Sequence, residues 1–126
     1  MKGIIGKKLG MTQVYTEDGR FVPVTVIEAG PCPVLALRTA EKNGYSAVQL
    51  GFGSRHPKNA SRALLGHVAA AGVAEAPPAV IREIRLDQDP AQGVGDTITA
   101  DSFAADEYVD VVGRTKGRGF QGVVKR

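Results

Sequence analysis

The chain has 126 residues, of which 43% are hydrophobic and 23% charged, so it has the size and composition of one globular domain and not of a disordered segment. Its net charge is only +3, but residues 1–16 and 113–126 contain bases and no acids, whereas residues 68–112 hold nine acids against two arginines. One cysteine, Cys32, excludes an intramolecular disulfide, and the lack of a long apolar run excludes a membrane-spanning helix and a secretory signal, which favours a reducing, cytoplasmic location.

Strand signals dominate the first half of the chain. Gly6 and Gly10 disfavour a helix in residues 4–15, and the apolar spacing there predicts two short strands that join near Gly10. The Asp-Gly pair in residues 16–20 predicts a tight hairpin turn. Further strands are predicted at residues 21–28, 34–39 and 45–52, and turns at residues 29–33 and 41–44.

The second half begins with a polar, basic loop at residues 53–61. Ser61 is a candidate N-cap for a short helix over residues 62–71 that ends at Gly72. Strands are predicted at residues 79–86, 96–100 and 108–112. Short strands, frequent turn residues and one short helix predict a mostly-β fold, a small barrel or sandwich, and no linker divides residues 1–126 into two domains.

No group of residues has the pattern of a catalytic or metal site. Cys32 lies between two prolines with no base nearby, and His56 and His67 have no cysteine or carboxylate at ligand spacing. Residues 113–119 resemble a phosphate-binding loop but lack its Gly-Lys-Ser/Thr ending. The acids of residues 87–110 are interpreted as a solvated face rather than as paired catalytic carboxylates. The sequence therefore predicts no enzymatic activity, no cofactor and no metal.

Residues 109–112 form a short apolar run, and residues 113–126, here named the basic tail, follow it. Five basic side chains would be costly to bury in a core but can displace counterions from phosphates, and the glycines allow the backbone to approach closely. The alternative is that the cluster is only a solvated end of the chain. Phe120 and Gln121 favour RNA, because an aromatic ring stacks on bases and an amide hydrogen-bonds to them. Matching positive surface is expected from the N-terminal lysines and from the loop residues Arg55, His56, Lys58 and Arg62.

Four segments resemble the ribosomal protein L3 family of the bacterial large subunit: MKGIIGKKLGMTQVY (1–15), VPVTVIEAGPCPV (22–34), GYSAVQLGFG (44–53) and GRTKGRGFQGVVKR (113–126). The resemblance implies a β-barrel like that of translation factors, and binding to ribosomal RNA beside neighbouring ribosomal proteins early in large-subunit assembly. It also implies that the basic tail is the base of an extension that penetrates RNA toward the peptidyl-transferase centre. With the loop residues and Phe120 added, the expected RNA-binding residues are Lys2, Lys7, Lys8, Arg55, His56, Lys58, Arg62, Arg114, Lys116, Arg118, Phe120, Gln121, Lys125 and Arg126.

Family members continue past the position that matches Arg126, so the resemblance implies a barrel that lacks strands. The chain is then a shortened form, one piece of a split protein or an engineered partial barrel. An open sheet edge would allow pairing with a second copy. The alternative to a structural ribosomal protein is therefore a homodimer with weak or no affinity for RNA.

Overall fold

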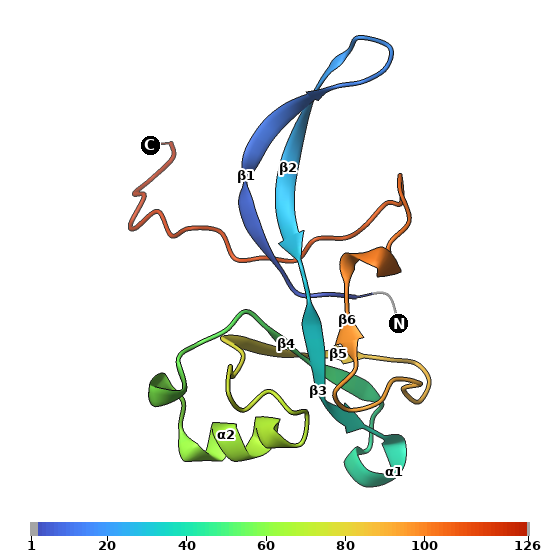
Figure 1. Ribbon diagram of the computed structural model, residues 1–126. Helices are drawn as coiled ribbons and strands as arrows, with labels where there is room; N and C mark the ends of the chain where they lie inside the picture. Colours follow the sequence, from blue (N-terminus) through green and yellow to red (C-terminus); the bar gives the residue numbers. More distant parts are fainter. Residues whose placement is uncertain (1–2, 126) are drawn as a thin grey trace.

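The computed structural model describes residues 3–125, which form two antiparallel sheets and few helices (Figure 1). A hairpin of two strands projects from a body built on a four-stranded sheet, whose strand order is β5-β4-β3-β6. The strands are β1 (Gly6–Tyr15), β2 (Phe21–Ala29), β3 (Cys32–Arg38), β4 (Ala47–Phe52), β5 (Val80–Arg85) and β6 (Thr97–Ile98). The helices are α1 (Ala40–Asn43) and α2 (Arg62–Ala69), with 3₁₀ turns η1 (Pro57–Asn59) and η2 (Ala100–Ser102).

The core lies around β3 and β4, the two central strands of the larger sheet. Val34 pairs with Leu50 across these strands, and both are fully buried together with Val48 and Cys32. Successive side chains of a strand point to opposite faces, so the same strands also supply Leu35 to the other face, close to Gly51. Val68 of α2 is buried as well. Burial on both faces explains why these strands lack a simple apolar–polar alternation.

Helix α2 begins where the sequence predicts it. Ser61 has extended backbone angles, and its side-chain oxygen accepts a hydrogen bond from the Leu64 backbone N–H at 3.2 Å. This satisfies one of the amides that a helix start leaves without an intrahelical partner. The helix ends at Ala69, two residues before the predicted end, and Gly72 then takes a positive φ of 74°.

The hairpin contains one long first strand where two short ones were predicted. The pairing of β1 with β2 shifts register between Lys8 and Gly10, so an irregularity in a continuous strand accommodates the glycine. The predicted turn is confirmed: Gly19 has a φ of 73°, and its N–H donates to the Thr16 carbonyl at 2.9 Å. Most hairpin side chains are exposed, including Met11 at 67%.

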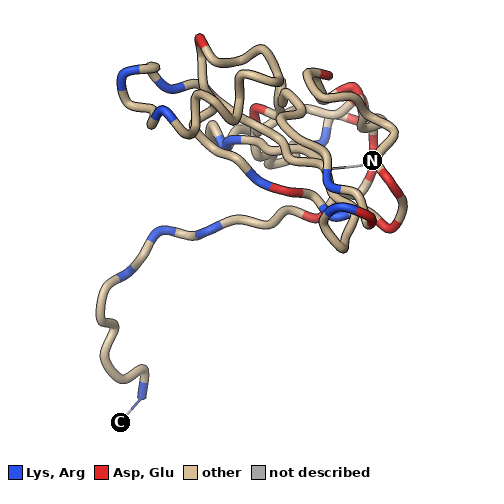
Figure 2. Tube along the Cα trace, turned by 90° about the horizontal axis from the view of Figure 1, so that it is seen from below, with Lys and Arg blue, Asp and Glu red and all other residues tan. Residues whose placement is uncertain are grey.

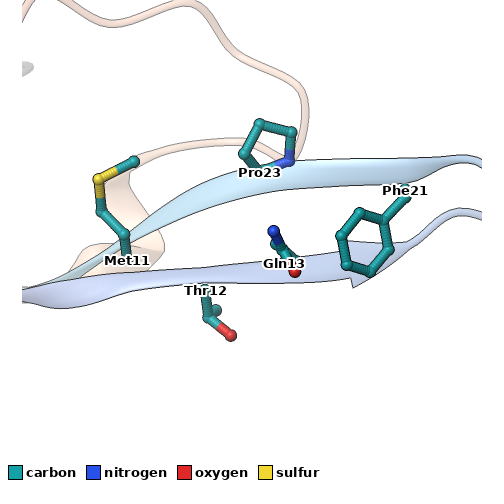
Figure 3. Close-up of a pocket in the computed structure, with 5 residues that line it drawn as sticks. All are labelled: Met11, Thr12, Gln13, Phe21 and Pro23. Atoms are coloured by element: carbon teal, nitrogen blue, oxygen red, sulfur yellow. The ribbon is translucent and has the colours of Figure 1, made fainter.

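The hairpin has a shallow hollow of about 440 Å³ beside Met11, Thr12, Gln13, Phe21 and Pro23. Figure 3 shows Met11 and Pro23 on one side of the ribbon and Thr12 on the other. The lining includes no ionisable side chain, so the hollow is not a candidate site for binding phosphate.

Three further local predictions are wrong, each for a structural reason. The predicted turn at residues 29–33 is shorter, because Gly30 and Pro31 complete it and Cys32 already pairs with Ile98 in β6. Residues 41–44 lie mainly in the short helix α1 instead of a simple turn. The strand predicted at residues 108–112 is absent, because no strand among residues 3–125 pairs with it.

The fold class is confirmed as mostly β with an incomplete barrel. Within residues 3–125 the two sheets remain separate and do not close. Strand β6 covers β3 only at Cys32 and Pro33, and β5 has a partner on one side alone, so the larger sheet has open edges.

Candidate nucleic-acid interface

The basic tail leaves the body and runs in the open. From residue 107 to residue 125 the chain has neither helix nor strand. Figure 2 shows it departing from the body, with Lys and Arg along its length and no acid after its start. The tail therefore does not fold back onto the acidic segments of its own chain.

Four cations of the tail fall within the described residues, and all are exposed: Arg114, Lys116, Arg118 and Lys125. Between residues 3 and 125, no ion pair joins any of them to a carboxylate. Asp110 is the last acid of the chain. Their positive charge is thus compensated only by mobile counterions, which a polyanion can displace.

Two glycines shape the part of the tail that carries the aromatic ring and the amide. Gly119 and Gly122 have φ values of 66° and 65°, a left-handed conformation that other residues rarely adopt. Phe120 and Gln121 lie between them and are exposed, the Phe120 ring completely. A fully exposed phenyl ring is available to stack on a base.

The loop residues fall into two pairs with different surroundings. Arg55 donates from Nη2 to the Ala79 carbonyl at 2.9 Å, and His56 caps η1 by accepting from the Lys58 N–H at 3.2 Å. These two side chains therefore help to shape the loop. Lys58 and Arg62 are exposed, and no ion pair within residues 3–125 involves either of them.

Two of the three N-terminal lysines, Lys7 and Lys8, lie on the hairpin. Lys7 and Lys8 are exposed in β1, where Lys7 is opposite Glu28 and Lys8 is opposite Ile27. Lys2 and Arg126 lie outside the described residues. The described basic residues thus lie on three separate segments of the chain: strand β1, the loop with the start of α2, and the tail.

The side chains of His67 and Cys32 contact other parts of the fold. His67 extends from α2 to the sheet, where its Nε2 contacts the Gln49 side-chain oxygen. The Cys32 thiol is buried and donates to the Ile5 carbonyl at 3.4 Å, and burial raises the pKa of the Cys32 thiol. In the part of the chain that the structure describes, no three His, Cys, Asp or Glu side chains are placed to hold a metal ion. No helix within residues 3–125 is long and apolar enough to cross a membrane.

Carboxylates gather on one side of the body, largely away from the tail's distal half (Figure 2). Two of them accept hydrogen bonds from their own chain: Asp96 accepts from the Gly93 N–H of the same loop at 2.6 Å, and Asp89 accepts from the Ser46 hydroxyl, 43 residues away in the sequence, at 2.6 Å. This arrangement is consistent with the solvated face that the sequence predicts. RNA phosphates would be repelled there.

One polar cluster was missed by the sequence reasoning. Glu83 of β5 accepts from the Tyr45 hydroxyl at 2.7 Å, from Arg38 Nε at 3.1 Å and from Gln49 Nε2 at 3.1 Å. The Tyr45 hydrogen bond, followed by Arg38, lowers the pKa of Glu83, and the same hydrogen bond raises the pKa of Tyr45. The sequence offered one signal for this cluster: Glu83 and Arg85 are alternate polar residues in β5, so they point to the same face of the sheet. Their partners are far away in the sequence and could not be identified from it.

Comparison with known proteins gives consistent matches. A family model described as ribosomal protein L3 matches residues 78–126. The proteins named large ribosomal subunit protein uL3 from Geobacter sulfurreducens and Pelotomaculum thermopropionicum are 51% and 54% identical over 125 residues, which is 99% of this chain and 59% of each relative. The protein of the same name from Planobispora rosea is 49% identical over 126 residues, covering the whole of this chain and 89% of that relative. The chain thus spans about three fifths of the length of the first two relatives.

Proposed function

Because the chain belongs to the ribosomal protein L3 family, we propose that it is a structural, RNA-binding component of the large ribosomal subunit in the cytoplasm. In this role it binds large-subunit ribosomal RNA, lies beside neighbouring ribosomal proteins and supports assembly of the subunit. The family is one of structural proteins and not of enzymes, in agreement with the expectation from the sequence. The chain needs no cofactor for this role.

The observation that carries the proposal is the exposed basic tail. Four described cations extend from the body without an ion-pair partner among residues 3–125. A folded protein has little stability to gain from such a segment, because like charges repel and the large apolar side chains of the tail are exposed. Phosphates supply the missing counter-charge, and binding gains the entropy of the counterions that they release.

Within this proposal the tail residues have different roles. Arg114, Lys116, Arg118 and Lys125 neutralise phosphates, and Phe120 stacks on a base while Gln121 hydrogen-bonds beside it. The positive φ of the two flanking glycines lets the backbone turn without a side chain between it and the sugar-phosphate surface. Lys2 and Arg126, expected to face RNA from the family resemblance, belong to the same proposal.

The body contributes weaker contacts. Lys58 and Arg62 bind phosphates directly, while Arg55 and His56 hold the loop that presents them. Lys7 and Lys8 give a further contact at the base of the hairpin, although Glu28 opposite Lys7 reduces the local charge. The acidic side of the body then faces solvent or a neighbouring protein, because phosphates avoid it (Figure 2).

The test is binding to large-subunit ribosomal RNA, with small-subunit ribosomal RNA as the control of equal charge density. We expect tighter binding to the large-subunit RNA by a filter-binding titration at physiological salt. Equal affinity for the two RNAs would reduce the proposal to nonspecific binding, and no binding to either would contradict it. The alternative of a homodimer formed through an open sheet edge gains no support from the comparisons.

A further inference from the structure

One face of the larger sheet presents two arginines in the same cross-strand row. In the pairing of β3 with β4, Arg38 lies opposite Ala47, and in the pairing of β4 with β5, Ala47 lies opposite Arg85. Residues directly opposite each other point to the same face of a sheet. Arg38 and Arg85 therefore flank a small buried residue on one face, two strand spacings or about 10 Å apart.

Both guanidinium groups are held by neighbours that leave nitrogen atoms available. Arg38 is held by Glu83, because the Arg38 Nε atom lies 3.1 Å from Glu83 Oε1. The Arg85 guanidinium carbon lies over the Tyr45 ring, 5.1 Å from the ring centre. The Tyr45 ring is itself fixed, because its hydroxyl donates to Glu83 at 2.7 Å. Within residues 3–125, no hydrogen bond or ion pair engages the Nη atoms of Arg38 or any nitrogen of Arg85.

The cluster of Arg38, Arg85 and Glu83 has a net positive charge, which favours binding of an anion. Two arginines and one carboxylate leave one positive charge, and Glu83 already accepts three hydrogen bonds. Glu83 contacts Arg38 through Nε alone, so this ion pair does not use the two Nη atoms. Two Nη atoms of one guanidinium match the oxygens of a singly charged phosphodiester, which arginine binds with two-pronged geometry.

We propose that Arg38 and Arg85 bind one phosphate of the RNA backbone, with Glu83 and Tyr45 as positioning residues. This contact lies on the sheet face and is separate from the basic tail, the loop and the hairpin lysines. The proposal rests on the proposed RNA-binding function and adds a second, rigid contact to it. A group fixed on a strand loses less conformational freedom on binding than one on a tail without helix or strand. The sheet contact would therefore fix the orientation of the protein on the RNA.

The test uses the full chain and a transcript of large-subunit ribosomal RNA, titrated at several salt concentrations. Among the described residues the Arg85 side chain makes no hydrogen bond, so we expect the fold to persist in Arg85→Ala. One lost phosphate contact should weaken binding about four- to sixfold at physiological salt and reduce the salt slope by about one unit. The matched control is Arg82→Ala, because Arg82 lies in the same strand, opposite Leu50, and points to the other face.

Glu83→Gln separates positioning from simple charge. Removing a negative charge would tighten RNA binding if net charge alone mattered. If Glu83 orients Arg38, Glu83→Gln should weaken binding instead, measured at a temperature at which the variant is fully folded. Tighter binding by Glu83→Gln, wild-type binding by Arg85→Ala, or an equal loss with Arg82→Ala would each overturn the inference.

The tail variant Arg114→Ala/Lys116→Ala/Arg118→Ala makes the two failures distinguishable. If this variant loses affinity while Arg85→Ala does not, the sheet contact is absent but the proposed function stands. If the wild-type chain does not bind the RNA transcript, the proposed function fails and the sheet contact fails with it.

Discussion

Neutralising three cations of the basic tail should weaken RNA binding strongly without affecting the fold. The variant is Arg114→Ala/Lys116→Ala/Arg118→Ala. These side chains are exposed and have no ion-pair partner among residues 3–125, so their removal leaves no buried group unsatisfied. We therefore expect the thermal unfolding midpoint to stay unchanged.

The magnitude follows from counterion release. Each phosphate contact contributes about 0.7 to 0.9 to the slope of log affinity against log salt concentration, so three contacts contribute about 2 to 3. At about 0.15 M salt this corresponds to a loss of roughly 50- to 170-fold in affinity. Between about 50 and 200 mM salt, the ratio of wild-type to variant affinity should shrink by roughly 20- to 40-fold.

The assay is a fluorescence-anisotropy titration of labelled large-subunit RNA at each salt concentration. The matched control, Arg20→Ala/Lys42→Ala/Arg82→Ala, removes the same charge from exposed positions outside the candidate interface. It should retain nearly the wild-type slope. An unchanged slope in the tail variant, or an equal fall in the control, would refute the assignment of the tail as a specific phosphate contact.

Three further predictions concern the body that holds the tail. Ser61→Ala removes the helix cap and should lower the free energy of unfolding by about 1 kcal/mol in urea denaturation; an unchanged value would mean that the cap contributes nothing. In Gly51→Ala the new Cβ would lie 2.9 Å from a Pro78 side-chain carbon, so we expect a loss of about 1 to 3 kcal/mol, whereas Gly66→Ala, whose Cβ meets nothing within 4 Å, should stabilise α2 by up to about 1 kcal/mol. The pKa of Glu83 is lowered by a tyrosine hydroxyl and by an arginine, so its stabilising effect is present above the ordinary value of 4.5 and is lost as the pH falls below it. Thermal midpoints of wild type and Glu83→Gln should therefore converge in acid, and a constant difference would contradict this.

Local features of the fold could be predicted from sequence because their causes are local. The Asp-Gly turn needs a residue with positive φ, and Gly19 supplies it next to strongly strand-forming segments. Ser61 combines an oxygen acceptor with a following helical pattern, which is sufficient to place the start of α2.

Pairing is not a local property, and this explains the wrong prediction at residues 108–112. Valines there favour extended backbone, but a strand also needs a partner at hydrogen-bonding distance. None of the strands in residues 3–125 is placed to pair with it. Conversely, the prolines flanking Cys32 suggested a turn, yet pairing with Ile98 makes Cys32 the first residue of β3.

The candidate site likewise has one part that the sequence predicts and one part that it does not. The tail's charges are adjacent in sequence, so composition alone identifies them. The cluster around Glu83 joins Arg38, which is 45 residues away, through the register of three strands. A change of one residue in that register would send Arg38 and Arg85 to opposite faces, so no sequence pattern predicts their proximity.

The most direct measurement of the central claim is amide chemical-shift mapping of the isotope-labelled chain as large-subunit RNA fragments are added. Our account predicts that residues 113–125 show the largest changes and become ordered, that residues 55–62 change less, and that the acidic loops around Asp89 and Asp101 keep their shifts. Saturable changes centred on the acidic loops, with the tail amides unmoved, would contradict it.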